Sequence, residues 1–235
     1  MKRLNPMRYW RPVWVALAVA GAAYVIVSIA LTPSPYAGYD IGAYWAVDPE
    51  DPYRVHVAPA LGAFLYSPPL VWLFQPLGLL ELHEARLLWL SMEAGLLALM
   101  AGPLTLLAAF LPPVYNELNV GNIGLLMAAS LVAGLTRWPA AWAFPILTKV
   151  TPVIGLAWFV GRKDWRGLGI AAVTTLAIAA VSFVLAPGLW FEWFDVLTAN
   201  REVTTDLYLG PLWLRAGLAA VVCWWAGRTD RAWLV

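Results

Sequence analysis

Charged residues, cysteine and histidine are scarce in this sequence. Only 12% of the 235 residues are charged, about half the share of an average soluble domain, whereas 62% are apolar. A surface that faces water cannot be built from that composition. The net charge of +1 comes without a concentrated basic face, which excludes a nucleic-acid partner. The single cysteine, Cys223, excludes an internal disulfide and leaves the redox compartment open.

Several sequence signals of soluble enzymes are missing as well. The sequence contains no P-loop, no dinucleotide-binding glycine pattern, no zinc-ligand spacing and no nucleophile elbow. The two histidines, His56 and His83, stand alone, and each is better explained as an interfacial residue than as a ligand. An enzyme that uses nucleotide sugars also needs a soluble cytoplasmic domain, for which this chain has no room.

Long uncharged runs are present instead. Asp, Glu, Lys and Arg are absent from residues 12–39, 55–80, 94–116 and 167–191. Several of these runs reach the roughly 20 apolar residues that cross the hydrocarbon core of a bilayer. The sequence therefore predicts an integral membrane protein of several closely packed helices.

The orientation of the first span follows from basic residues near the amino terminus. Lys2, Arg3, Arg8 and Arg11 precede the apolar run 12–31, and short basic segments stay on the cytoplasmic side. The run is longer than the apolar region of a cleaved signal peptide, which has about 7 to 15 residues. We therefore expect a retained signal anchor with a cytoplasmic amino terminus.

The next segment, residues 32–58, is the longest polar stretch and is expected on the extracytoplasmic face. Asp48, Glu50 and Asp51 in this segment are best explained as residues of a solvated loop. Asp40 differs, because it lies between aromatic residues just past the membrane exit. Partial desolvation at such a position favours a general base.

The run 57–80 can be placed in two ways. It is apolar enough to span the membrane, but its four prolines interrupt helical hydrogen bonding, so it can instead form short interfacial helices. Both layouts put the carboxyl terminus in the cytoplasm. Basic residues near a span favour the cytoplasmic side. Arg137 on this criterion favours the interfacial layout and Arg86 favours the spanning layout, so charge does not decide between the two.

The interfacial layout predicts spans at residues 86–102, 103–114, 123–136, 139–148, 152–161, 168–186 and 211–227. Several of these pieces are short, and a helix of ten residues rises only about 15 Å. Such pieces can cross only where the protein is thin or hollow. Irregular backbone is tolerated at membrane depth where it lines a cavity.

Four polar or proline-rich stretches occur in a distinctive order. They are Tyr39-Asp40 with Tyr44 and Asp51-Pro52-Tyr53; Phe64 to Leu70 with Gln75-Pro76-Leu77; Pro112 to Asn122; and Leu147 to Pro152, which is close to a Lys-x-x-Pro turn. The third stretch is compared with a Gly-Gln-x-Asn pattern. In this sequence Asn122 occupies the position of the glutamine and Gly124 that of the asparagine. Their order over residues 39–166 resembles the polyprenol-phosphate-mannose-dependent mannosyltransferases of glycosyltransferase family 87, in the GT-C superfamily. This resemblance favours the interfacial layout.

The resemblance implies an all-α, polytopic, GT-C-like helical bundle with about eight membrane helices plus interfacial juxtamembrane helices. Residues 1–235 would form a single transmembrane domain. Its parts would be a first span at 12–31, an extracytoplasmic catalytic loop with interfacial helices at 32–85, core spans at 86–186, an extracytoplasmic loop at 187–210 and a last span at 211–227. Relatives usually continue for several more spans, so we expect a short or truncated member of the family.

The resemblance also implies a reaction, that of an inverting hexosyltransferase in the plasma membrane. The enzyme would move mannose from a polyprenyl-phosphate donor to a lipid or glycan acceptor, with Asp40 as the general base. Asp40, the segment 116–122 and Lys149 would face one extracytoplasmic cavity. No cofactor and no obligatory metal are implied, although Asp40 with Asp48 or Asp51 has the chemistry to chelate a divalent ion. The expected partners are membrane lipids, the lipid-linked donor and the acceptor.

Other candidate residues have both a functional and a structural explanation. Lys149 either binds the leaving phosphate or extends to the lipid headgroups, and its Lys-x-x-Pro context favours phosphate binding. Asn116 and Asn122 either orient substrate hydroxyls or cap helices in a tight turn. Tyr44 either supports a sugar ring or belongs to an interfacial aromatic belt. Arg201 either contacts a lipid phosphate or anchors the chain at the headgroups.

Two other classes of function stay open. A transporter or flippase of lipid-linked sugars also uses an intramembrane lysine and proline-broken helices, but internal repeats, which would support it, are absent from the sequence. A noncatalytic membrane subunit is favoured by the short chain and by the few polar residues in the apolar runs. Such a subunit would be indifferent to the loss of Asp40.

Overall fold

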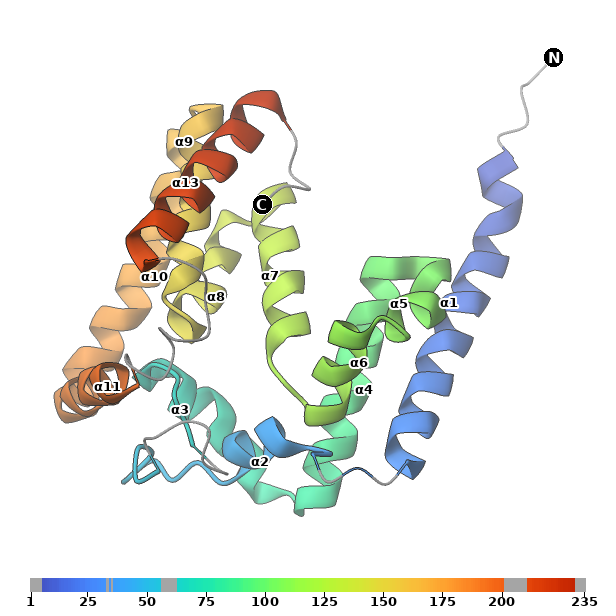
Figure 1. The fold of residues 1–235 in the computed structure, drawn as a ribbon, viewed down its shortest axis with the longest axis horizontal. Coiled ribbons are helices and arrows are strands. Elements are labelled where there is room, and N and C mark those ends of the chain that lie inside the picture. Colours follow the sequence, from blue (N-terminus) through green and yellow to red (C-terminus); the bar gives the residue numbers. More distant parts are fainter. Residues whose placement is uncertain (1–5, 33, 35, 56–62, 201–210, 231–235) are drawn as a thin grey trace. The chain divides into compact units, whose positions relative to one another are not determined.

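Helices form all the regular secondary structure in the part of the chain that the computed structural model describes, residues 6–32, 34, 36–55, 63–200 and 211–230 (Figure 1). The α-helices are α1 (Pro6–Leu31), α2 (Tyr39–Trp45), α3 (Pro68–Phe74), α4 (Leu82–Ala101), α5 (Thr105–Ala109), α6 (Pro112–Val120), α7 (Gly124–Thr136), α8 (Ala143–Thr148), α9 (Ala157–Arg162), α10 (Trp165–Leu185), α11 (Pro187–Ala199) and α13 (Leu212–Thr229). Short 3-10 helices join them: η1 (Gln75–Leu79), η2 (Gly102–Leu104), η3 (Pro139–Trp142) and η4 (Thr151–Leu156). The predicted all-α fold is confirmed.

Proline and capping residues set many of the helix boundaries. Pro68, Pro112 and Pro187 are the first residues of α3, α6 and α11. Proline suits this position because its fixed φ is helical and the first turn has no use for its missing N–H. Helix α4 begins with a capping box, in which the Glu81 side chain accepts from the backbone of Glu84 and the Glu84 carboxylate accepts from the Glu81 N–H at 3.0 Å.

Among the residues that the structure describes, three helical segments are long and apolar enough to cross a membrane, namely Arg11–Leu31, Leu82–Ala109 and Trp165–Leu185. The pair Pro112–Val120 and Gly124–Thr136, bent by 112°, makes a fourth if it counts as one broken span. Helix α10 exposes large apolar side chains such as Val173, Leu176 and Val184, as a helix that faces lipid does. The chain is thus an all-α membrane protein, while the count of eight membrane helices stays a prediction.

The described part of the run 57–80 contains no helix of membrane length. It holds the 7-residue α3 and the 5-residue η1, which supports the interfacial layout. The predicted short pieces around Lys149 are also present, as α8, η4 and α9. Two expected loop regions contain helices, because Tyr39–Trp45 forms α2 and Pro187–Ala199 forms α11.

The chain divides into two compact units, Met1–Ala46 with Leu77–Ala129 and Val47–Pro76 with Ser130–Val235. In the first unit α1 packs along α4 and α5, shown in blue and green in Figure 1. Its core contains the buried residues Val25, Ile29, Leu90, Ala94, Leu97, Ala109, Leu118 and Leu125. This unit also contains α2, which carries Asp40.

In the second unit α13 packs along α9, shown in red and yellow-orange in Figure 1. Both helices carry the pattern Trp-x-x-Gly, from Trp158 to Gly161 in α9 and from Trp224 to Gly227 in α13. A Cβ atom on either glycine would collide with the carbonyl oxygen of the other pattern's tryptophan. The two backbones therefore touch at a reciprocal contact that only glycine permits, as small residues allow between membrane helices.

Candidate active site

Asp40 lies in the first turn of α2, a seven-residue helix that its neighbours hold in place. Gly38 precedes the helix in the left-handed conformation, with φ 72°, and its N–H donates to the carbonyl of Asn119 at 2.8 Å. On the opposite end the Trp45 indole N–H donates to the carbonyl of Leu80 at 2.8 Å. A carboxylate in a first turn is favoured by the helix dipole. Asp40 itself is half-buried.

The buried face of α2 fixes this helix on α4. Ile41, Ala43 and Tyr44 are buried, and the Tyr44 ring packs on Trp89 with the ring centroids 5.1 Å apart. Tyr44 is 0% exposed, so in this structure its ring offers no surface to a sugar. It serves instead as the anchor of the helix that carries Asp40.

Glu93, a further carboxylate of the first unit, lies close enough to Asp40 to interact with it electrostatically. Glu93 in α4 is 0% exposed, and its charged neighbours are Glu117 and Asp40, with the Trp89 indole as the neighbour that can donate to it. The sequence analysis did not single out Glu93 or Glu117. A carboxylate within an apolar span indicates a functional site by itself, so the sequence alone could have pointed to Glu93.

Residues 116–122 act mainly as a structural junction between α6 and α7. The Glu117 carboxylate accepts from the N–H of Gly124 at 3.2 Å and from the Asn122 amide at 3.4 Å, and so caps the amino end of α7. Asn122 also accepts from the N–H of Ile123 at 2.7 Å. The Asn119 amide donates to Ser34 Oγ at 3.1 Å. The helix-cap explanation therefore accounts for Asn122 without a ligand.

Asn116 and Gly121 occupy different places in this junction. Asn116 is exposed on α6. Gly121 ends α6 in the left-handed conformation, with φ 70°, and a Cβ atom there would lie 3.0 Å from the Cβ atom of Ile41. The junction thus packs directly against α2, one residue from Asp40.

Lys149 belongs to the second unit and lies at a break between helices. It ends α8 in an extended conformation, and η4 begins two residues later. This break lies between the spans 139–148 and 152–161 that the sequence predicts. Lys149 is exposed, and its ammonium group makes no hydrogen bond or ion pair with the residues that the structure describes.

The remaining candidates are less informative about chemistry. Arg201 lies outside the described residues. Asp48 accepts from the N–H of Glu50 at 3.0 Å, which is a turn contact of the kind expected in a solvated loop. Within the described ranges, no cluster of three His, Cys, Asp or Glu side chains has the arrangement of a metal site.

A hollow of about 480 Å³ lies in the second unit among Asp51, Tyr53, Arg54, Glu192 and Asp195. The Tyr53 hydroxyl donates to the carbonyl of Tyr66 at 2.8 Å. Burial, and then the charge of Glu192, raise the pKa of Tyr53 above its ordinary value. Tyr53 is therefore a neutral hydrogen-bond donor that holds the loop, and it is not poised to release a proton.

Comparisons with known proteins identify a family for this chain. No curated protein and no solved structure matches it. The profile of glycosyltransferase family 87 matches residues 64–235, which include α3 to α13, whereas α1 and the Asp40 segment precede the matched region. The match covers well over half of the chain and includes the second, third and fourth of the stretches on which the resemblance rests. The chain therefore belongs to glycosyltransferase family 87.

Proposed function

We propose that this glycosyltransferase transfers a hexose, mannose, from a polyprenyl-phosphate donor to a hydroxyl of a lipid or glycan acceptor on the extracytoplasmic face of the plasma membrane. The observation that carries the proposal is the placement of Asp40. It is half-buried in the first turn of α2, and the contacts of Gly38 and Tyr44 hold that helix beside the ends of two spans. A general base has to be positioned in this way before its substrate arrives.

The proposed reaction is an inverting displacement at the anomeric carbon. The Asp40 carboxylate takes the proton of the acceptor hydroxyl while the hydroxyl oxygen attacks that carbon. The bond from the carbon to the phosphate oxygen breaks, and its electron pair leaves with the lipid phosphate. The exposed ammonium group of Lys149, at the break between α8 and η4, would stabilise the negative charge of the leaving phosphate.

The orientation in the membrane is supported by charge. Lys2, Arg3, Arg8 and Arg11 precede the first span, and short basic segments remain cytoplasmic. Helix α1 then ends at Leu31, and Asp40 follows within nine residues, so Asp40 lies on the side opposite the amino terminus.

The test is sugar transfer in membranes that contain the full chain, with radiolabelled polyprenyl-phosphate-mannose as the donor. Asp40→Asn is expected to lower the rate roughly 100-fold or more at equal protein level, because a positioned general base contributes about that much. Asp48→Asn is the matched control, since an asparagine there can still accept from the Glu50 N–H. Transfer that survives in Asp40→Asn would remove Asp40 from the mechanism.

A second pair of variants tests the phosphate role of Lys149. Lys149→Ala is expected to raise the KM for the donor, whereas Lys149→Arg keeps the charge and should retain most of the activity. Lys163→Ala, which removes another exposed lysine of the same unit, is the control. If the native chain transfers no sugar with every acceptor class present, the proposal fails in favour of a noncatalytic membrane subunit.

A further inference from the structure

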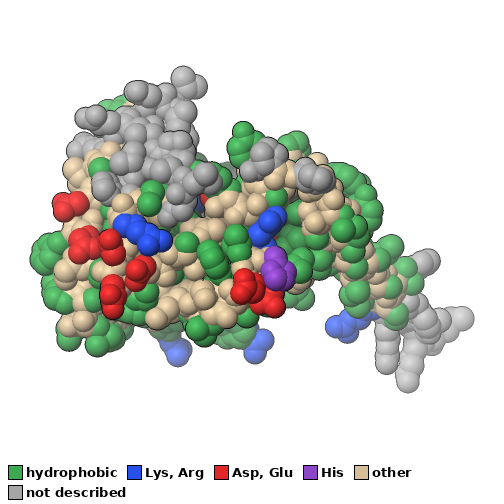
Figure 2. Space-filling view, turned by 90° about the horizontal axis from the view of Figure 1, so that it is seen from below, with side chains coloured by type: hydrophobic (Ala, Val, Ile, Leu, Met, Phe, Trp, Pro, Cys, Tyr) green, Lys and Arg blue, Asp and Glu red, His purple; other side chains and the backbone are tan. Residues whose placement is uncertain are grey.

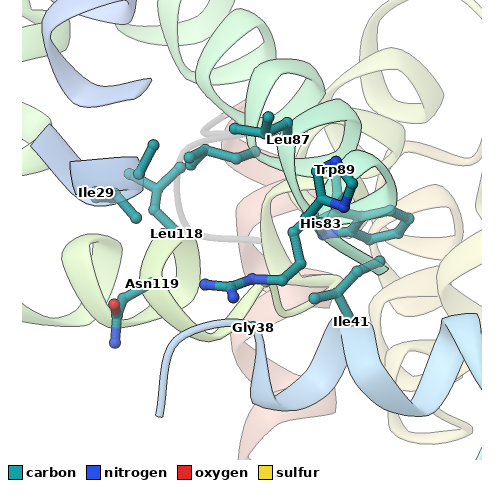
Figure 3. A pocket seen from close by; sticks show the side chains of 12 residues that line it. Ile29, Gly38, Ile41, His83, Leu87, Trp89, Leu118 and Asn119 are labelled. Carbon is teal, nitrogen blue, oxygen red and sulfur yellow. The ribbon is translucent and has the colours of Figure 1, made fainter. Parts of the chain in front are cut away.

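A pocket of about 200 Å³ in the first unit has a cationic side chain and no assigned role. It lies where the end of α1 meets the start of α4, and Ile29, Leu87 and Leu118 line its apolar part. His83, Arg86 and Asn119 line its polar part. Figure 3 shows the labelled side chains of this pocket. His83 is exposed, and Figure 2 shows a histidine side chain at the surface beside acidic side chains.

The Arg86 side chain lies directly against the backbone of Gly38. Its side chain passes over Gly38, where a Cβ atom would lie 2.5 Å from the Arg86 Nε atom. Gly38 also has a φ of 72°, so both its conformation and the approach of Arg86 require glycine. Asp40 is two residues further along the chain.

The guanidinium of Arg86 makes no ion pair or hydrogen bond with the residues that the structure describes. The nearby Glu81 and Glu84 side chains are engaged with each other's backbone in the capping box. A half-buried guanidinium favours an anion that accepts two parallel hydrogen bonds, and phosphate has that geometry. The charge of this pocket therefore matches a phosphate group.

An apolar groove of about 840 Å³ runs along the same two helices. It is lined on α1 by Val15, Val19, Ala22 and Ile26, and on α4 by Ser91, Gly95 and Ala98. On α1, Ile26 of the groove lies three residues before Ile29 and four residues before Ala30, which both line the pocket. On α4, Ser91 of the groove lies four residues after Leu87, which lines the pocket.

Residues three and four apart lie on one face of a helix, so the groove and the pocket occupy the same face of α1 and the same face of α4. A chain that lies from Ile29 to Val15 would follow α1 for about 21 Å, at about 1.5 Å per residue. The two cavities together thus provide a cationic site for a headgroup and a groove for one long apolar tail.

We propose that the groove and pocket between α1 and α4 bind a polyprenyl phosphate, with Arg86 and His83 on the phosphate and the isoprenoid chain along the groove. This inference rests on the proposed function, since it assigns the site of the donor's lipid carrier. A single groove between two helices accommodates one chain, whereas a bilayer phospholipid brings two. The bound phosphate then lies next to the segment that carries Asp40.

Binding of a sugar-free carrier tests this site separately from catalysis. The full chain in detergent would be titrated with tritiated polyprenyl phosphate, with polyprenol and phosphatidylglycerol as competitors. Arg86→Gln is expected to weaken binding of polyprenyl phosphate roughly 10- to 100-fold, the effect of losing a hydrogen-bonded charge, and to leave polyprenol binding unchanged. Arg86→Lys should recover part of the loss. Unchanged binding in Arg86→Gln would overturn the phosphate site.

The groove has its own variant. A Cβ atom on Gly95 meets nothing within 4 Å, so Gly95→Leu fills the groove without a clash in α4. It should weaken binding of polyprenol and polyprenyl phosphate alike. Gly169→Leu, at an equally open position of α10, is the control and should bind as the native chain does. Full binding in Gly95→Leu would overturn the groove, and equal competition by phosphatidylglycerol would overturn the isoprenoid occupant.

The outcomes also separate this inference from the proposed function. Asp40→Asn should bind polyprenyl phosphate normally while it loses sugar transfer. If binding depends on Arg86 but no transfer occurs with the native chain, the lipid site stands and the proposed reaction fails. If transfer occurs but Arg86→Gln binds the carrier as well as the native chain does, the reaction stands and the site is wrong.

Discussion

The reciprocal glycine contact between α9 and α13 makes Gly227→Ala a sharp test of how the last helix is held. In an open helix, alanine in place of glycine stabilises the folded state by about 0.5 to 1 kcal/mol. At Gly227 the new methyl group would meet the Trp158 carbonyl oxygen, and overpacking of this kind costs about 1 to 3 kcal/mol. Gly217→Ala, in the same helix with nothing within 4 Å, keeps the gain and avoids the clash. The two variants should therefore differ by about 1 to 3 kcal/mol.

The only cysteine of the chain provides the assay. Cys223 is buried on α13, so a thiol-reactive fluorogenic dye labels it when α13 separates from its neighbours during heating. For a chain of this length the expected difference corresponds to roughly 2–12 °C between the labelling temperatures of Gly217→Ala and Gly227→Ala. Gly161→Ala should behave as Gly227→Ala does. Equal labelling temperatures for the Gly217 and Gly227 variants would refute the backbone contact.

Two further predictions concern the helix junction and the loop of the second unit. Glu117→Ala should lower the free energy of unfolding by about 1 to 2 kcal/mol, because it removes the cap of α7. Glu117→Gln should lower it less, since the amide oxygen of the glutamine still accepts a hydrogen bond. Thermal unfolding in detergent measures both changes. The raised pKa of Tyr53 means that above about pH 10 the unfolded chain releases a proton that the folded chain keeps. The free energy of unfolding should therefore be fully retained below that pH and fall above it by up to about 1.4 kcal/mol per pH unit. Tyr53→Phe should flatten this decline, and an equally steep decline in that variant would contradict the assignment.

The positions of the long helices could be predicted from the sequence because apolar runs there are bounded by proline or charge. The expected spans 86–102, 123–136, 168–186 and 211–227 correspond to Leu82–Ala101, Gly124–Thr136, Trp165–Leu185 and Leu212–Thr229. The short helix α2 was not foreseen, since seven residues give too little periodicity to recognise. Its stability comes from contacts with α4 and with the Asn119 carbonyl, which are distant in sequence.

The candidate site was predictable only in part. The polar segment 116–122 was recognised. Its capping residues could not be identified, because they depend on the direction of the Glu117 side chain, which the local sequence does not determine. Arg86 was weighed only as an orientation signal. Its place above Gly38 results from the packing of α4 on the segment before α2, a contact between residues nearly fifty positions apart.

The close approach of Gly121 to Ile41 links a bent span to the candidate base. Helices α6 and α7 meet at 112°, and the residue at that corner presses on the side chain that follows Asp40. A change in the bend would therefore shift α2 and move the carboxylate with it. Straightening of this span would therefore displace the helix on which the proposed reaction depends, although no residue of α6 or α7 itself takes part in that reaction.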